Sequence, residues 1–100
     1  MTEYIFKSNG NYFGFISNGN LFSRDSEYLG WIEDNFVWDF TGRFRGQVIE
    51  INNHKYIIRN MFLIPPIPKI PKIPPVPPVP PAPPANIVPI IISMGFKDAF

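Results

Sequence analysis

A sixteen-residue repeat in the first half of the chain restricts its fold more than any other feature. One phrase occurs three times at this spacing, as Tyr12-Phe13-Gly14-Phe15-Ile16, Tyr28-Leu29-Gly30-Trp31-Ile32 and Phe44-Arg45-Gly46-Gln47-Val48. An apolar pair precedes each copy at a constant distance, as Ile5-Phe6, Leu21-Phe22 and Val37-Trp38. A fixed period of this kind indicates copies of one supersecondary unit that bury their apolar faces against one another.

Each unit is expected to be a β-hairpin. The apolar segments are short and rich in β-branched and aromatic residues, and Gly, Asn, Asp or Ser separates them, which favours strands over helices. One unit has room for two strands of about four to six residues and two turns. We expect strands at 3–7, 12–17, 20–23, 28–33, 36–39, 44–51, 55–59 and 61–64. Residues that tolerate positive φ mark the turns between units, at Asn18-Gly19, Asp34-Asn35 and Asn52-Asn53.

The repeated glycines predict a crowded position. Side chains alternate between the two faces of a strand, so Tyr12, Gly14 and Ile16 should share one face. The equivalent sets are Tyr28, Gly30 and Ile32, and Phe44, Gly46 and Val48. Because glycine weakens a strand interior, three in register indicate places where the backbones of neighbouring units converge. The opposite face, which carries Phe13 and Phe15 in the first copy, is repeated less faithfully and is expected to be more exposed or more specialised.

A fourth repeat unit is only partly recognisable in the sequence. At strict spacing it would begin at Asn53, with Asn60, Phe62 and Ile64 in the places of the aromatic residue, the glycine and the aliphatic residue. Terminal repeats often differ from the others because they close the array. We therefore predict an all-β domain at residues 1–64, a small closed barrel of four pseudo-symmetric hairpins whose first and last strands seal the edges.

The hairpin unit with its Tyr-x-Gly-x-Ile strands, followed by a proline-rich tail, resembles the four-fold β-flower proteins. The likeness covers about residues 3–64, and the register of Gly14, Gly30 and Gly46 is its most specific part. The degenerate fourth unit is where this chain departs from the pattern. The resemblance implies a shallow, symmetric barrel of hairpins arranged like petals. It implies no activity and no site residues, because the family offers no established activity to carry over.

A proline tract follows the repeats. Twelve of the thirteen prolines lie between Pro65 and Pro84. Proline fixes φ and lacks a backbone donor, so residues 65–84 should adopt polyproline II and form a semi-rigid spacer about 60 Å long. The tract could be a plain spacer or a ligand for an aromatic-lined groove. Lys72, Pro75 and Pro78 match the basic-plus-PxxP pattern of such ligands, although a proline-dense tract also meets that pattern by chance.

Residues 85–100 form an apolar C-terminal segment, and this is where we expect a binding function to lie. The candidate partner-binding side chains are Ile90, Ile91, Ile92, Phe96 and Phe100. The segment could return to the domain as a strand, insert into a protein partner or touch a membrane surface. Its longest apolar run is far shorter than the ~20 residues of a spanning helix.

Charge and cysteine content exclude several classes of function. A net charge of +1 offers no electrostatic footprint for nucleic acid, although Arg43 and Arg45 flank Phe44 as in RNA-binding strands. The absence of cysteine excludes disulfides and thiolate metal sites and fits a reducing compartment. The first residues show no basic region followed by an apolar run, so no signal peptide is expected. We therefore expect a cytoplasmic protein, with a peripheral membrane location left open.

No catalytic motif is present. His54 is the only histidine, and no acid, nucleophile or metal partner accompanies it in the sequence. We expect no enzyme activity, cofactor or metal. The favoured function is a non-catalytic binding or scaffolding module that presents its tail to a protein partner or membrane surface. The alternative is a small barrel that binds an apolar small molecule or lipid, and the small core leaves oligomerisation open.

Overall fold

The computed structural model describes residues 2–92 and 94–100, and these form an all-β structure without helices. The strands are β1 (Thr2–Phe6), β2 (Tyr12–Ser17), β3 (Asn20–Ser23), β4 (Tyr28–Glu33), β5 (Phe36–Asp39), β6 (Phe44–Ile51), β7 (His54–Asn60) and β8 (Phe96–Asp98). The first seven predicted strands are confirmed, each to within one residue at its ends. The predicted strand at 61–64 is wrong, because this segment is a turn.

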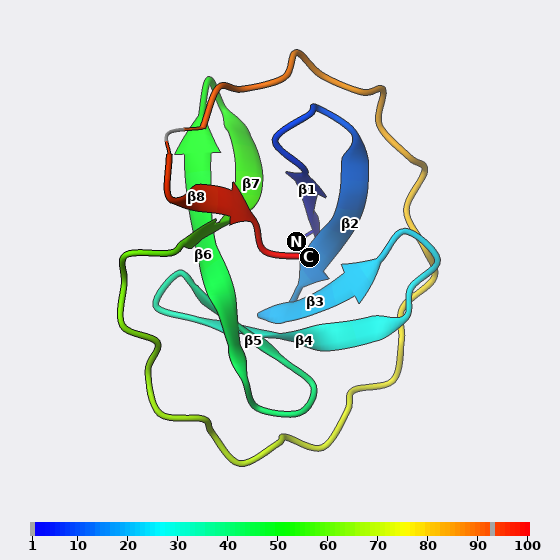
Figure 1. Cartoon of the computed structure of the whole chain (residues 1–100). Coiled ribbons are helices and arrows are strands. Elements are labelled where there is room, and N and C mark those ends of the chain that lie inside the picture. Colours follow the sequence, from blue (N-terminus) through cyan, green and yellow to red (C-terminus); the bar gives the residue numbers. More distant parts are fainter. Residues whose placement is uncertain (1, 93) are drawn as a thin grey trace.

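The first seven strands close into a barrel (Figure 1). Each pairs antiparallel with the next along the chain. A short parallel pairing between β1 and β7, with Ile5 opposite Lys55 and Phe6 opposite Tyr56, seals the ring. The predicted closed barrel is therefore confirmed. Closure leaves no long unpaired edge on either terminal strand.

The fourth hairpin is completed from the end of the chain. The strand β8 pairs antiparallel with β7, with Ile58 opposite Asp98 and Asn60 opposite Phe96. Our strict-spacing assignment of Asn60, Phe62 and Ile64 to this unit is wrong. Proline cannot donate to a ladder, so no strand can continue into the tract that starts at Pro65, and the missing strand comes from beyond it.

A β-bulge recurs in each of the three repeats and corrects the predicted alternation. The pairing runs from Ile5 opposite Gly14 to Phe6 opposite Tyr12, so that Phe13 is left out of register. Leu29 and Arg45 are skipped in the same way. An extra residue reverses the side to which the following side chains point. Tyr12 therefore lies on the outer face, whereas Phe13 and Ile16 pack into the inner core.

Two layers of side chains result. The inner core is aliphatic and consists of Ile5, Ile16, Leu21, Val37, Ile57 and Ala99, with Phe13, Leu29, Ile32, Val48 and Phe100 packed against it. The outer faces of the strands carry large rings, which we call the aromatic girdle: Phe6, Tyr12, Phe15, Phe22, Tyr28, Trp31, Trp38, Phe44 and Tyr56. Of the two alternatives for the opposite face, more exposed or more specialised, the first is wrong in the first two repeats, since Phe15 and Trp31 are each about 1 % exposed.

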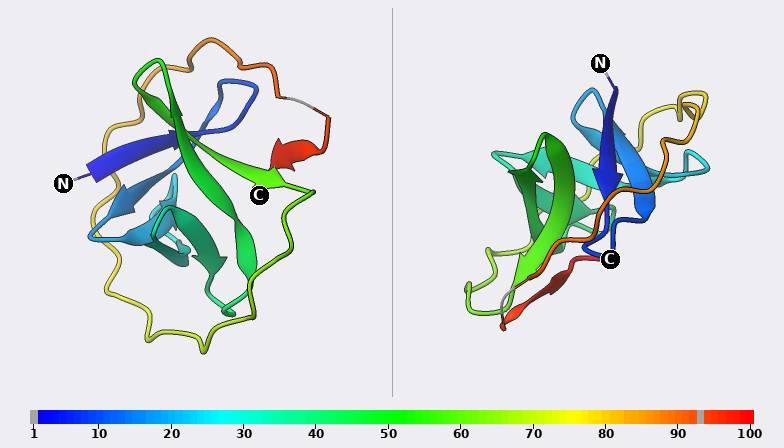
Figure 2. Two further views of the ribbon diagram at one scale, coloured as in Figure 1. Left: turned by 90° about the vertical axis from the view of Figure 1, so that its left-hand side faces the viewer. Right: turned by 90° about the horizontal axis from the view of Figure 1, so that it is seen from above.

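The proline tract covers this girdle and does not project from it. Residues 61–92, which we call the strap, run round the barrel in every view (Figures 1 and 2). The whole molecule measures 35 × 35 × 17 Å, with a radius of gyration of 13.0 Å. A straight spacer of about 60 Å would not fit these dimensions. The expected projecting spacer at 65–84 is therefore not what the structure shows, because its inward side chains are held against the barrel.

The three repeated glycines lie where successive hairpins meet. A Cβ at Gly14 would overlap the carbonyl oxygen of Phe22, and one at Gly30 would overlap that of Trp38. At Gly46 the nearest atoms would be the Ile58 oxygen at 2.7 Å and the Ala99 Cβ at 2.9 Å. Each glycine thus allows close approach of the next hairpin around the ring.

This packing makes a testable prediction for Gly14. We expect Gly14→Ala to lower the free energy of unfolding by about 3 kcal/mol, because a backbone carbonyl cannot move aside. Gly19→Asn is the matched control: that turn is open, and Asn35 and Asn53 hold positive φ at the equivalent positions. It should change stability by less than about 0.5 kcal/mol. Equal denaturation midpoints for both variants would contradict the packing argument.

Candidate functional site

The strap is a polyproline II segment in which every third residue faces the barrel. The half-buried positions from 63 to 90 are Leu63, Pro66, Pro75, Pro78, Pro81, Pro84, Ile87 and Ile90, and Lys69 and Lys72 continue the same series. This spacing follows from the three residues per turn of polyproline II. The candidate site is therefore the surface where this inward face meets the aromatic girdle.

Four of the hydrogen bonds between strap and barrel recur from hairpin to hairpin, one at each, and we call these four the anchor points. The backbone N–H of Lys69 donates to the Gly42 oxygen at 2.8 Å, and that of Ile87 donates to the Gly10 oxygen at 2.9 Å. The Met61 N–H donates in the same way to the carbonyl of Gly95 at the fourth hairpin. Nine residues of polyproline II span about 28 Å, close to a quarter of the perimeter of a disc 35 Å across, roughly 27 Å. The strap therefore advances by about nine residues per hairpin.

At the second hairpin the anchor is also a hydrogen bond, but here the donor lies on the barrel and the acceptor lies on the strap. Pro78 lies midway between Lys69 and Ile87 and has no N–H to donate. The turn opposite it carries Ser26 where two other hairpins have Gly10 and Gly42. The Ser26 hydroxyl donates to the carbonyl oxygen of Pro78. The serine thus supplies the donor that the proline removes.

Two lysines bind the strap to the girdle electrostatically. The ammonium groups of Lys69 and Lys72 lie 2.5 and 2.9 Å from the carboxylate oxygens of Glu33. Each also lies over an indole ring, Lys69 over Trp38 at 4.9 Å and Lys72 over Trp31 at 5.1 Å. Hydrogen bonds from the two lysines lower the pKa of Glu33 to about 2. Glu33 thus stays ionised through most of the acidic range.

The predicted groove ligand binds its own chain. Lys72, Pro75 and Pro78 all lie on the inward face, against the girdle. The basic-plus-PxxP pattern therefore meets an aromatic surface within the same molecule. In the docked strap, Pro75 and Pro78 are half-buried, and the ammonium of Lys72 is engaged with Glu33.

Three polar groups of the girdle are buried without a hydrogen-bond partner among the described residues. They are the hydroxyls of Tyr12 and Tyr28 and the indole nitrogen of Trp38. Burial raises the pKa of both tyrosines, with the nearby Tyr4 adding to the effect at Tyr12. Both hydroxyls therefore remain protonated at neutral pH, and the indole N–H can only donate. All three groups are thus hydrogen-bond donors at neutral pH.

The candidate side chains of the C-terminal segment are divided between the barrel and the surface. Ile90 and Ile92 pack against the cluster that contains Phe6 and Tyr12, and Phe100 stacks on Phe13 with 5.3 Å between ring centroids. Ile91 is fully exposed and Phe96 is 37 % exposed. The segment therefore docks mainly on its own domain.

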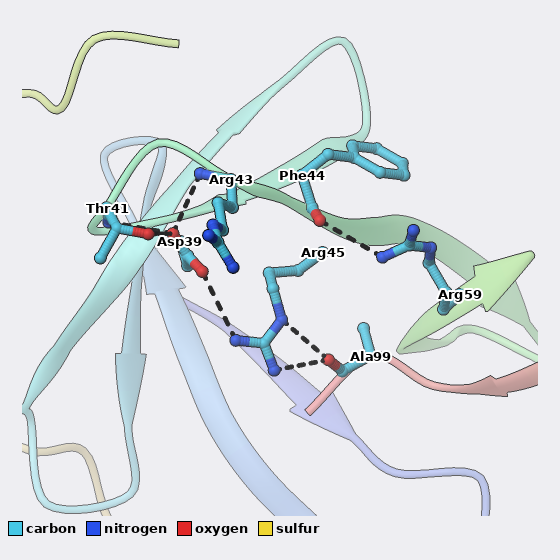
Figure 3. A network of polar contacts seen from close by, with 7 residues as sticks. All are labelled: Asp39, Thr41, Arg43, Phe44, Arg45, Arg59 and Ala99. Carbon is cyan, nitrogen blue, oxygen red and sulfur yellow. Dashed lines mark hydrogen bonds and ion pairs between the residues drawn. The ribbon is translucent and has the colours of Figure 1, made fainter. Parts of the chain in front are cut away.

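A network around Arg45 fixes the end of the chain (Figure 3). Its guanidinium donates to the Ala99 oxygen from Nε and Nη2, at 3.2 and 2.9 Å, and lies 4.2 Å from the Phe100 ring centroid. Nη1 lies 3.5 Å from Asp39. Burial opposes ionisation of Asp39, but hydrogen bonds from Thr41 and Arg43 outweigh it and lower its pKa. Arg45 is thus engaged in this network through its side chain, whereas Arg43, the other arginine of the predicted basic pair, takes part through its backbone N–H.

The comparisons with known proteins decide the family. The family described as 4-fold beta flower protein matches residues 1–92, which includes the strap. The chain belongs to the four-fold β-flower family. Neither a curated protein nor a solved structure matches it.

A cavity of about 410 Å³ lies beside the seam of this β-flower barrel. Its lining includes Phe6, His54, Pro84 and Ile87, so the strap forms part of its wall. His54 is exposed and lies edge-on to Phe6 at 5.7 Å. The nearby carboxylate, Glu3, is held by an ion pair with Lys55. Among the described residues, no cluster of His, Asp and Glu could hold a metal, and no helix is long and apolar enough to span a membrane.

Sequence reasoning missed the residues that hold the strap. Trp31, Glu33, Trp38, Ser26 and Lys69 were not identified as site residues. The triplet spacing of Lys69 and Lys72 was the available signal, because two lysines three residues apart share one face of a polyproline II helix. Their acidic partner could not be inferred without knowing that the tract turns back round the barrel.

The reversed anchor predicts coupling between Ser26 and Pro78. We expect Ser26→Gly alone to cost about 1 kcal/mol through the lost hydrogen bond. Pro78→Ala alone should cost about 0.4–1 kcal/mol through greater freedom of the unfolded chain. In the double variant, the N–H restored at position 78 can donate to the carbonyl at position 26, as at the first and third hairpins. A double-mutant cycle should show about 1 kcal/mol of favourable coupling, and strict additivity would contradict the interpretation.

The pKa of Glu33 predicts an acid-sensitive docking of the strap. Because the folded-state pKa lies below the ordinary value of 4.5, the carboxylate stabilises the docked state fully above about pH 4.5. This contribution is lost as the pH falls through about 2. The fluorescence of the two tryptophans, which both lie beneath the lysines, should report the transition. Glu33→Gln should remove this pH dependence, and an unchanged profile in that variant would contradict the assignment.

Proposed function

We propose that this β-flower protein is a non-catalytic binding module that presents the outer face of its strap to a protein partner with an apolar groove. The observation that carries the proposal is the series of aliphatic residues one position along from the inward face. They are Ile64, Ile67, Ile70, Ile73, Val76, Val79, Ala82, Ala85, Val88 and Ile91, which we call the aliphatic ridge. The Ile and Val members are between 81 % and 101 % exposed.

The ridge is unusual for a surface in contact only with water. Single exposed apolar side chains are ordinary, but a continuous series of them marks an interaction site in soluble proteins. The backbone that carries the ridge is already extended and held at four turns. A partner that binds it therefore orders few additional residues, which reduces the entropic cost of association.

Charge and shape favour a protein partner over a membrane. The two lysines of the strap face inward and are paired with Glu33, so the ridge offers no cation to anionic lipids. It also carries none of the Trp and Tyr residues that are typical of membrane-interface anchors. The strap curves round the barrel, so a flat surface would touch only a part of it (Figure 2). A concave groove fits a convex ridge better.

Affinity capture with ridge variants tests this function. Ile67→Ser, Ile70→Ser and Ile73→Ser are combined in one full-length chain, and the matched control carries valine at the same three positions. We expect a partner that binds wild type and the valine variant alike, and binds the serine variant at least about tenfold more weakly once the partner is purified. Truncation of the tail is unsuitable, because it would remove β8 from the barrel.

Two outcomes would contradict the proposal. One is a set of captured proteins that does not differ between the serine and valine variants. The other is ridge-dependent co-sedimentation with phospholipid vesicles, neutral or anionic, without a ridge-dependent protein partner. That second result would assign the ridge to a membrane surface.

A further inference from the structure

We infer that the aromatic girdle is a receptor site for proline-rich segments of other polypeptides, and that the strap is its competing ligand in the same chain. The ligand class is a polyproline II segment with Lys-x-x-Lys-x-x-Pro-x-x-Pro spacing. This inference concerns the inward contact of the strap and is independent of the outward ridge. It rests on charge complementarity, on unpaired donors and on the way the strap is attached.

Charge complementarity defines the ligand. Glu33 accepts from two ammonium groups that are three residues apart on the strap, and each ammonium lies over a tryptophan ring. One carboxylate, which also accepts a hydrogen bond from the Trp31 indole, thus binds two lysines on one face of a polyproline II helix. Nothing in this recognition depends on the covalent link between strap and barrel. A segment of the same chemistry on another chain would make the same contacts.

Unpaired donors indicate that the girdle can bind more than the strap offers it. The hydroxyls of Tyr12 and Tyr28 and the Trp38 indole N–H are buried without partners in residues 2–92 and 94–100. Polyproline II leaves its backbone carbonyls free to accept hydrogen bonds. A segment seated with its carbonyls toward these donors would satisfy groups that the strap leaves unsatisfied, and buried unpaired donors are costly. The strap therefore does not use the full binding capacity of the girdle.

The attachment of the strap allows exchange. It is joined to the barrel at both ends, through β7 and β8, and between them it has no ladder of backbone hydrogen bonds. Segments held by a few separated contacts open at low free energy. The strap can thus leave the girdle locally while the barrel stays closed. Its covalent attachment gives it a high effective concentration, so a free segment binds weakly until the strap is loosened.

A peptide-binding experiment on the full chain tests the receptor site. The probe is a synthetic peptide of residues 64–84 with blocked ends, titrated while the indole N–H signals of Trp31 and Trp38 are followed by NMR. The loosened protein carries Lys69→Ser and Lys72→Ser. The matched control protein carries Ile70→Ser and Ile73→Ser, on the outward face of the same stretch. We expect the peptide to bind the loosened protein about tenfold or more tightly than wild type, with the control equal to wild type.

Two further arms show that the recognised chemistry is the proposed one. A peptide with serine in place of both lysines should lose the binding, and so should the loosened protein when it also carries Glu33→Gln. The inference is overturned if the loosened protein binds the peptide no more tightly than wild type does, or if the lysine-free peptide binds equally well. Circular dichroism checks that the loosened protein is folded. If it is not, Ser26→Gly loosens the strap at another hairpin, and the same two comparisons decide.

Discussion

The contact between the polyproline strap and the aromatic girdle is the interaction on which the rest of the structure depends. The interior of the barrel is lined mainly by aliphatic side chains, and most of the large rings lie on its outer face. Left uncovered, a girdle of Phe, Tyr and Trp would expose a continuous apolar surface. A polyproline II segment can cover this apolar surface, because it needs no hydrogen-bonded neighbour and directs every third side chain toward the barrel. An ordinary segment would lose about 1–2 kcal/mol per residue on being fixed, whereas proline restricts φ in advance.

The strap also matches the symmetry of the barrel. Each hairpin contains sixteen residues, and about nine residues of the strap extend from one hairpin to the next. Each hairpin turn therefore contacts the strap in a similar place. The exception at Pro78 supports this reading, because the local chemistry changes while the contact remains. A proline at the anchor position removes a donor, and Ser26 supplies one from the opposite side. The hydrogen bond between strap and hairpin turn is thus kept, with the donor on the barrel at the second hairpin and on the strap at the other three.

The barrel could be predicted from the sequence and the strap could not. Closure and seven of the eight strands predicted from the repeat are confirmed, because period, turn residues and glycine register are local signals. The bulges at Phe13, Leu29 and Arg45 were missed, since an extra residue in a strand leaves no distinct pattern in composition. The fourth hairpin was misplaced because strict spacing was applied across a tract that interrupts the repeat. The three-residue period of inward, outward and proline positions could be recognised in the sequence. The path of the tract round the barrel could not, because it depends on long-range contacts such as that between Lys72 and Glu33.

The position of β8 after the proline tract explains how the strap can be fixed at its ends and still open locally between them. Because β8 completes the fourth hairpin and Arg45 binds the carbonyl of Ala99, the far end of the strap is fixed by the barrel itself. The strap therefore stays near the girdle even where its own contacts along its length are separated. It is retained as a loop closed at both ends, so weak and separated anchors are sufficient to keep it near the girdle. A surface covered in this way is protected from water and still accessible to a competitor. That combination distinguishes a strap from a strand of the barrel, whose removal would open the core.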